Sequence, residues 1–166
     1  STVGSLALAC VRSGVIKLKT YDSYTFERQY YKDSEKTILD GSPVKLKVLG
    51  FFDPKNNILA FSSSMTAEEI ASTIVHEYVH TTQVGKSMSI AEKEYEAHLV
   101  QAYFNLQMGI EQKDKSFLKL VDGKYVIDED AVKAYVDRIY GVDEKGSIKP
   151  YNNFNIKLEG YRDVEL

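Results

Sequence analysis

Residues 66–109 read TAEEIASTIVHEYVHTTQVGKSMSIAEKEYEAHLVQAYFNLQMG. Two pairs in this stretch, Thr66 with Glu69 and Ser89 with Glu92, have the spacing of a capping box, in which side chains satisfy free backbone groups at the start of a helix. Apolar residues recur at helical spacing after each pair. The stretch therefore predicts two consecutive helices.

Glycine follows each predicted helix, at Gly85 and Gly109, where a left-handed conformation would end it. Only Lys86–Met88 then connects the two helices, and so short a connection favours antiparallel packing. A third predicted helix shows the same signals, with a capping residue before it and a glycine after it: Asp128, about Glu129–Tyr140, and Gly141.

The first third of the chain reads as strands. Residues alternate in Val15–Tyr21 and Val44–Phe52, aromatic residues favour a strand at Tyr24–Tyr31, and Ile58–Phe61 is expected as a return strand. Turn-forming residues at 53–57 predict that the last two strands form a hairpin. Residues 145–166 look irregular or strand-like. These elements predict an α+β domain, with a small, mostly antiparallel sheet packed on the first predicted helix, a second helix after it and a C-terminal helix.

Composition limits the class of protein. Of 166 residues, 43% are hydrophobic, enough for one core, so we expect a single domain over residues 1–166. A net charge of −3 is unlike that of a nucleic-acid-binding protein, and no apolar run approaches the roughly twenty residues that span a bilayer. Cys10 cannot form an intrachain disulfide. Because the chain starts at Ser1 without an export segment, we expect a piece excised from a longer protein.

The first predicted helix contains His76-Glu77-Tyr78-Val79-His80. A spacing of four residues places both imidazoles on one face, where two nitrogens can bind one ion. Zinc accepts imidazole readily, and a catalytic zinc site has three protein ligands and a water. Glu77 lies next to the first ligand, where it can act as general base toward that water. Two of the chain's three histidines occupy this motif, which disfavours a purely structural explanation.

The third ligand is sought on the second predicted helix. His80 lies five residues before the first glycine, and Glu94 lies five residues after the serine that opens the second helix. Each is therefore about 7.5 Å along its helix axis from the connection, so the two should lie side by side in an antiparallel pair. By the same count His98 is level with His76. Glu94 is the predicted third ligand, Glu96 a solvated surface charge, and a three-histidine site that includes His98 stays open as an alternative.

The runs HEYVH at 76–80 and EYEAH at 94–98 resemble the gluzincin branch of zinc metallopeptidases. There the first helix supplies two histidines and a general base, and the second supplies a glutamate, which matches Glu94. The resemblance implies a zincin-like fold, Zn²⁺ as cofactor and hydrolysis of a peptide or protein substrate. Four residues after that glutamate the family usually has an aspartate that hydrogen-bonds the first histidine. His98 stands there instead, and we expect its imidazole to form one hydrogen bond with His76 from outside the ligand set.

The resemblance extends to the hairpin before the motif. In the family an exposed edge strand binds an extended peptide, which assigns substrate binding to Val48, Leu49, Gly50, Phe51 and Phe52. An ordinary core hairpin is the alternative. The family also supplies an oxyanion donor from beyond the second helix, for which the sequence leaves seven candidates: Tyr125, Tyr135, Tyr140, Tyr151, Tyr161, Arg138 and Arg162.

A catalytic domain this small fits a secreted or cell-surface effector or toxin module, with a parent protein or an inhibitor as partner. The competing prediction is a non-catalytic binding module that keeps a metal without turnover, because His98 replaces the usual aspartate. Glu77 argues against this alternative, since a metal site that only stabilises a fold needs no general base.

Overall fold

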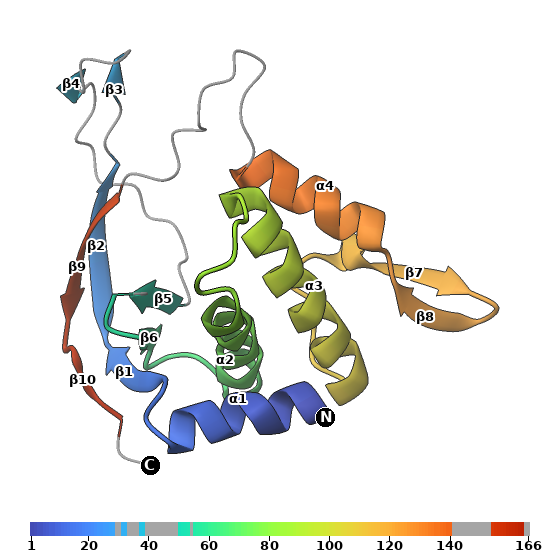
Figure 1. Ribbon diagram of the computed structural model, residues 1–166, viewed down its shortest axis with the longest axis horizontal. Coiled ribbons are helices and arrows are strands. Elements are labelled where there is room, and N and C mark those ends of the chain that lie inside the picture. The colour runs from blue at the N-terminus through green and yellow to red at the C-terminus, as the bar shows by residue number, and fades with distance from the viewer. Residues whose placement is uncertain (29–30, 33–36, 39–49, 54, 141–153, 165–166) are drawn as a thin grey trace.

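The computed structural model describes residues 1–28, 31–32, 37–38, 50–53, 55–140 and 154–164. Within these ranges the protein is α+β, with four α-helices beside several small sheets (Figure 1). The helices are α1 (Thr2–Arg12), α2 (Ala67–Thr82), α3 (Ile90–Met108) and α4 (Glu129–Tyr140), with a short 3₁₀ helix at Lys115–Phe117. None of the described helices combines the length and the apolar character needed to cross a membrane.

The main sheet has four strands in the order β10-β1-β6-β5. β1 runs parallel to β6, whereas β5 pairs with β6 and β10 with β1 in antiparallel fashion, so the sheet is mostly antiparallel, as predicted. Its strands are β1 (Lys17–Tyr21), β5 (Gly50–Asp53), β6 (Ile58–Ser62) and β10 (Arg162–Asp163). Three antiparallel pairs complete the described strands: β2 (Ser23–Arg28) with β9 (Phe154–Glu159), β3 (Tyr31–Lys32) with β4 (Thr37–Ile38), and β7 (Leu118–Val121) with β8 (Lys124–Ile127).

The two helices of residues 66–109 begin as predicted. Thr66 caps α2 and Ser89 caps α3, and both capping boxes are complete. Gly109 ends α3 with a φ of 67°, in the left-handed conformation expected of it. The predicted end of α2 was wrong, because the helix stops at Thr82 with Gln83 as its cap, and Gly85 has its φ of 80° in the turn beyond.

Helix α1 and the β7–β8 hairpin are among the elements that were not predicted. Ser1 caps helix α1, and its hydroxyl accepts a hydrogen bond from the backbone of Gly4. The β7–β8 hairpin turns at Asp122 and Gly123, with φ values of 50° and 76°. An Asp-Gly pair favours a hairpin turn in which both residues have positive φ. The sequence therefore held a signal that could have predicted this hairpin.

Helix α2 packs on both the sheet and the other helices. Leu59 of β6 is fully buried in a cluster against which Ile74 and Tyr78 of α2 pack. On another side, Val75 of α2 packs in a cluster with Phe104 of α3. Because apolar side chains hold α2 from both directions, the position of the motif on this helix is fixed by the core.

Candidate metal centre

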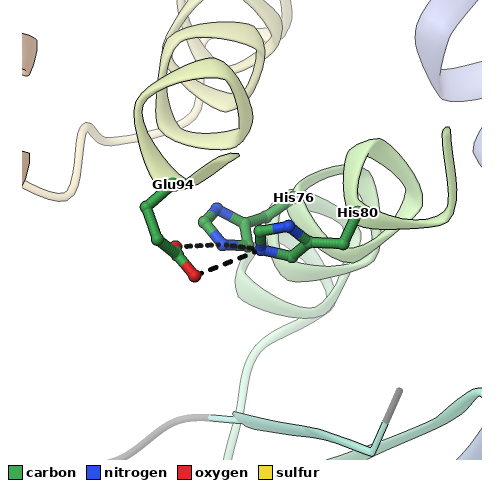
Figure 2. A group of neighbouring side chains, drawn as sticks. All are labelled: His76, His80 and Glu94. Atoms are coloured by element: carbon green, nitrogen blue, oxygen red, sulfur yellow. Dashed lines mark hydrogen bonds and ion pairs between the residues drawn. The ribbon is translucent and has the colours of Figure 1, made fainter. Parts of the chain in front are cut away.

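The structure brings His76, His80 and Glu94 together from two helices (Figure 2). The Nε2 atoms of His76 and His80 lie 3.2 Å apart. Oε2 of Glu94 lies 3.4 Å from Nε2 of His76, and Oε1 lies 3.5 Å from Nε2 of His80. One ligand atom from each residue lies within 4.8 Å of the others, so this group could hold a metal ion.

Local sequence positions the first two of these side chains and packing positions the third. His76 and His80 are one turn apart on α2, which the Thr66 capping box starts at a fixed residue. Glu94 lies in the second turn of α3, and its reach to the histidines depends on how α3 returns along α2.

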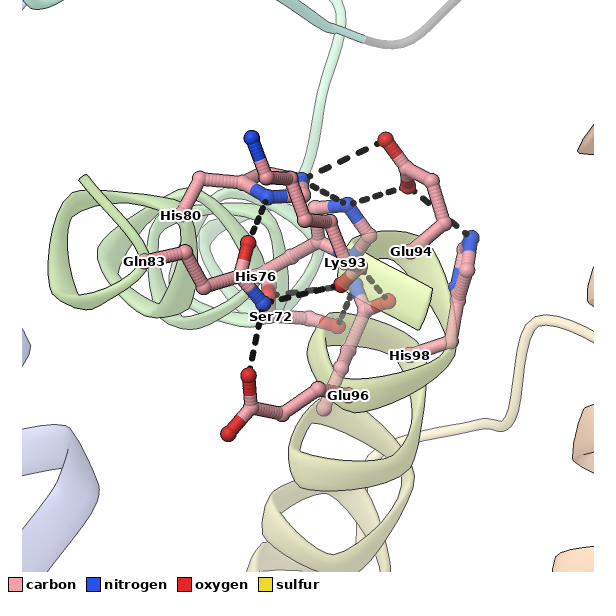
Figure 3. A network of polar contacts seen from close by, with 9 residues as sticks. Ser72, His76, His80, Gln83, Lys93, Glu94, Glu96 and His98 are labelled. Carbon is pink, nitrogen blue, oxygen red and sulfur yellow. Dashed lines mark hydrogen bonds and ion pairs between the residues drawn. The ribbon is translucent and has the colours of Figure 1, made fainter. Parts of the chain in front are cut away.

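A glutamine hydrogen-bonds the ring nitrogen of His80 that does not face Glu94 (Figure 3). Nδ1 of His80 lies 2.8 Å from Oε1 of Gln83, whose side chain is almost fully buried. The Nε2 amide of Gln83 donates to the backbone oxygen of Lys93 at 3.0 Å and to Oε2 of Glu96 at 2.8 Å. Glu96 is therefore part of the site's support, and its prediction as a solvated surface charge was wrong.

A second glutamine holds His76. Nδ1 of His76 lies 3.2 Å from Oε1 of Gln101 on α3. The Nε2 amide of Gln101 donates to the backbone oxygen of Ser72 at 3.1 Å and to its hydroxyl oxygen at 2.9 Å. Both imidazoles thus have one nitrogen hydrogen-bonded and the other facing Glu94.

Burial and charge favour the ligand forms of these groups. Desolvation lowers the pKa of His76, so that its imidazole is neutral at pH 7. Burial alone would raise the pKa of Glu94, but its contact with His76 and the charges of His80 and Lys113 outweigh this and lower it. A neutral imidazole and an ionised carboxylate are the forms that bind metal. Oε2 of Glu94 is buried, with Nε2 of His76 at 3.4 Å and Nε2 of His98 at 3.9 Å.

Glu77 faces the same cavity as the three candidate ligands. The cavity has a volume of about 450 Å³ and is lined by residues that include His76, Glu77, His80, Glu94 and Tyr140. Burial, and secondarily the charge of Glu94, raise the pKa of Glu77 to about 8. Its Oε2 atom has no hydrogen-bond partner in the described part of the chain. An unpaired buried carboxylate oxygen is costly unless a ligand satisfies it, so this oxygen of Glu77 points to a bound group.

His98 lies beside His76 but contacts it differently from our expectation. The two rings meet edge to face with centroids 4.5 Å apart, and neither ring nitrogen of His98 has a hydrogen-bond partner among the described residues. Gln101 instead makes the hydrogen bond expected from His98. Burial lowers the pKa of His98 to about 2, which keeps this ring uncharged, and its Nε2 atom lies 3.9 Å from Oε2 of Glu94.

Of the candidate oxyanion donors that the structure describes, Tyr140 is the one that lines the cavity. Tyr135 packs its ring against His98, and Arg138 lies over the Tyr135 ring. The remaining candidates lie elsewhere: Tyr125 and Tyr161 are exposed, Arg162 pairs with Asp22, and Tyr151 lies outside the described residues.

The predicted substrate strand is only partly described. Val48 and Leu49 lie outside the described residues, whereas Gly50, Phe51 and Phe52 belong to β5. β5 is the last strand in the described order of the main sheet and pairs with β6 on one side. Its position is therefore that of an edge strand among the described strands.

Sequence reasoning missed Gln83 and Gln101, although their spacing carried a signal. Gln83 follows His80 by three residues, and Gln101 follows Glu94 by seven, so each lies on the helical face of a predicted ligand. Glutamine is common on helix surfaces, however, and nothing in its type distinguishes a buried amide from an exposed one.

The chain was also compared with known proteins. No protein family, no curated protein and no solved structure gave a significant match.

Proposed function

We propose that the chain is a zinc-dependent metallopeptidase, in which His76, His80 and Glu94 hold Zn²⁺ and Glu77 is the general base. One observation carries the proposal: an unpaired glutamate carboxylate lies in the same cavity as a three-residue metal group. A metal that only stabilises a fold has no need of such a group. The resemblance of the two sequence runs to gluzincins supports the same conclusion.

The separations of the ligand atoms fit zinc. Ligands bound to zinc at about 2.0–2.1 Å in a tetrahedral arrangement lie about 3.3–3.4 Å from one another. The separations here are 3.2 Å between the two imidazoles, and 3.4 Å and 3.5 Å from the imidazoles to the carboxylate. Two imidazoles and one carboxylate also form a ligand set that catalytic zinc sites use, with one position left for water.

When bound, Zn²⁺ would lower the pKa of a water and polarise the carbonyl group of the substrate. Beside a bound cation Glu77 would be ionised, and its carboxylate would accept the proton of that water and pass it to the leaving amine. The hydroxyl of Tyr140, on the wall of the same cavity, would donate a hydrogen bond to the carbonyl oxygen as its charge develops.

The cavity wall also suggests how a peptide would bind. Val84 and Ile90 line the cavity although 80% and 53% of their surface is exposed, so they present apolar area beside the ligands. An apolar side chain of the substrate would bury this area. A peptide added to the edge strand β5 would supply backbone hydrogen bonds.

The test is to incubate zinc-loaded protein with a diverse peptide mixture and to identify new termini by mass spectrometry. We expect cleavage by the parent chain, none by Glu77→Gln and none after treatment with a chelator. Zinc content should be the same in the parent and in Glu77→Gln, and lost in His80→Ala. Equal cleavage by the parent and by Glu77→Gln would rule out the mechanism.

The second candidate is a binding module that keeps its metal without turnover. The groups at Nδ1 of the two imidazoles favour this candidate, because both are glutamine amides and neither is a carboxylate. A carboxylate there would make the ligand more basic. Retained zinc without cleavage of any peptide would support this candidate over the peptidase.

A further inference from the structure

The amide of Gln83 has only one orientation that satisfies its neighbours. One end of the amide faces the backbone oxygen of Lys93 and the carboxylate of Glu96, at 3.0 Å and 2.8 Å. Both of these groups can only accept hydrogen bonds, so the NH₂ group must face them. The amide oxygen then faces Nδ1 of His80 at 2.8 Å. Because that oxygen can only accept, Nδ1 of His80 must carry the hydrogen.

The same logic applies to Gln101. Its NH₂ group faces the backbone oxygen of Ser72, another pure acceptor, at 3.1 Å, and the Ser72 hydroxyl oxygen at 2.9 Å. The amide oxygen of Gln101 therefore faces Nδ1 of His76 at 3.2 Å, and this nitrogen must also carry the hydrogen. In each neutral imidazole the lone pair is then left on Nε2.

We propose that Gln83 and Gln101 are positioning residues that fix both imidazoles as Nδ1–H tautomers, so that two Nε2 lone pairs and the Glu94 carboxylate converge on one cation. This inference rests on the proposed metal site but makes a separate statement about the metal-free protein. The convergence itself supports it, because the two Nε2 atoms lie 3.2 Å apart, about the separation of two ligands of one zinc ion.

Gln83 also links two ligands to each other. It accepts from His80 and donates to the backbone of Lys93, the residue before Glu94. The amide therefore fixes the direction of one ligand and ties the helix that carries another. The NH₂ group of this amide also donates to the carboxylate of Glu96. Hydrogen bonds to charged acceptors are stronger than those to neutral ones.

The direct test is nitrogen NMR of the histidine rings in the metal-free protein, above the pH at which imidazole is protonated. We expect Nδ1–H tautomers at His76 and His80 in the parent chain. In Gln83→Met, His80 should become a mixture of tautomers while His76 is unchanged, and Gln101→Met should give the reverse. An Nε2–H tautomer at either position in the parent would overturn the proposal, whether or not the protein binds zinc or cleaves peptides.

Zinc affinity, measured by competition with a chromophoric chelator, is the second readout. Gln83→Met and Gln101→Met should each weaken binding by about 10–100-fold, the usual cost of losing such a partner. Gln107→Met is the matched control, since Gln107 is exposed on the same helix, and it should change nothing. Unchanged affinity in both single Met variants would contradict the positioning role.

Failure of the positioning proposal and failure of the peptidase proposal give different results. If the parent shows the expected tautomers and the Met variants lose zinc affinity, but no peptide is cleaved, the positioning role stands and the peptidase proposal fails. If peptides are cleaved but the tautomers are reversed, the peptidase proposal stands and the positioning role fails.

Discussion

Nε2 of His80 and Oε1 of Glu94 lie 3.5 Å apart, although the two residues belong to different helices. An ion between them would therefore hold α2 and α3 together, and it would bind the folded chain far better than the unfolded one. Metal binding and stability are coupled for this reason.

Zinc should raise the melting temperature of the metal-free protein. At a zinc concentration a hundredfold above Kd, the stabilisation is about 2.7 kcal/mol. In a domain of this size that corresponds to a rise in Tm of about 5–11 °C, measurable by circular dichroism. Glu94→Gln should shrink the rise and His80→Ala should remove it. Glu111→Gln, which changes an exposed glutamate beyond α3, should keep the full rise.

Glu77 should make the metal-free protein less stable as pH increases. Its pKa is about 8 in the fold against 4.5 for a glutamate exposed to water, so folding favours the protonated form. The stability associated with this group is fully present below pH 4.5 and is lost as pH rises through about 8. Glu77→Gln removes this loss. We expect the Tm of Glu77→Gln minus that of the parent, both in chelator, to be larger at pH 8 than at pH 5, and a constant difference would contradict the raised pKa.

Tyr140 should contribute to catalysis through its hydroxyl. If it donates to the developing oxyanion, Tyr140→Phe should lower kcat by about 10²–10³-fold with a smaller effect on KM. Tyr125→Phe removes an exposed hydroxyl from the β7–β8 hairpin and should leave kcat unchanged. Full activity in Tyr140→Phe would show that the oxyanion donor is another group.

The capping box of α2 should support the site through the helix itself. The Thr66 hydroxyl accepts from the backbone of Glu69 at 3.2 Å, and the Glu69 carboxylate accepts in return from the backbone of Thr66 at 2.9 Å. Thr66→Ala should cost about 1 kcal/mol of stability. That lowers Tm by about 2–4 °C in thermal unfolding of the metal-free protein. Thr66→Ser keeps the hydroxyl and should behave like the parent chain.

Some features of the fold could be read from the sequence because they depend on neighbouring residues. The starts of α2 and α3 follow from side chains that hydrogen-bond the backbone three residues away. Strand β1 follows from alternation along a few residues, and β6 follows from the turn residues before it. Helix α1 was not predicted, and its buried residues, Ala7 and Val11, find their partners on distant elements.

The sequence alone determined that His76 and His80 share one face of a helix, because 3.6 residues per turn leave no other arrangement for a spacing of four. Only the tertiary structure decided that Gln101, and not His98, hydrogen-bonds His76, and that Gln83 and Glu96 support His80. These contacts depend on how far α3 is rotated and shifted against α2. That relation is set by packing between residues far apart in the chain, and helical spacing does not specify it.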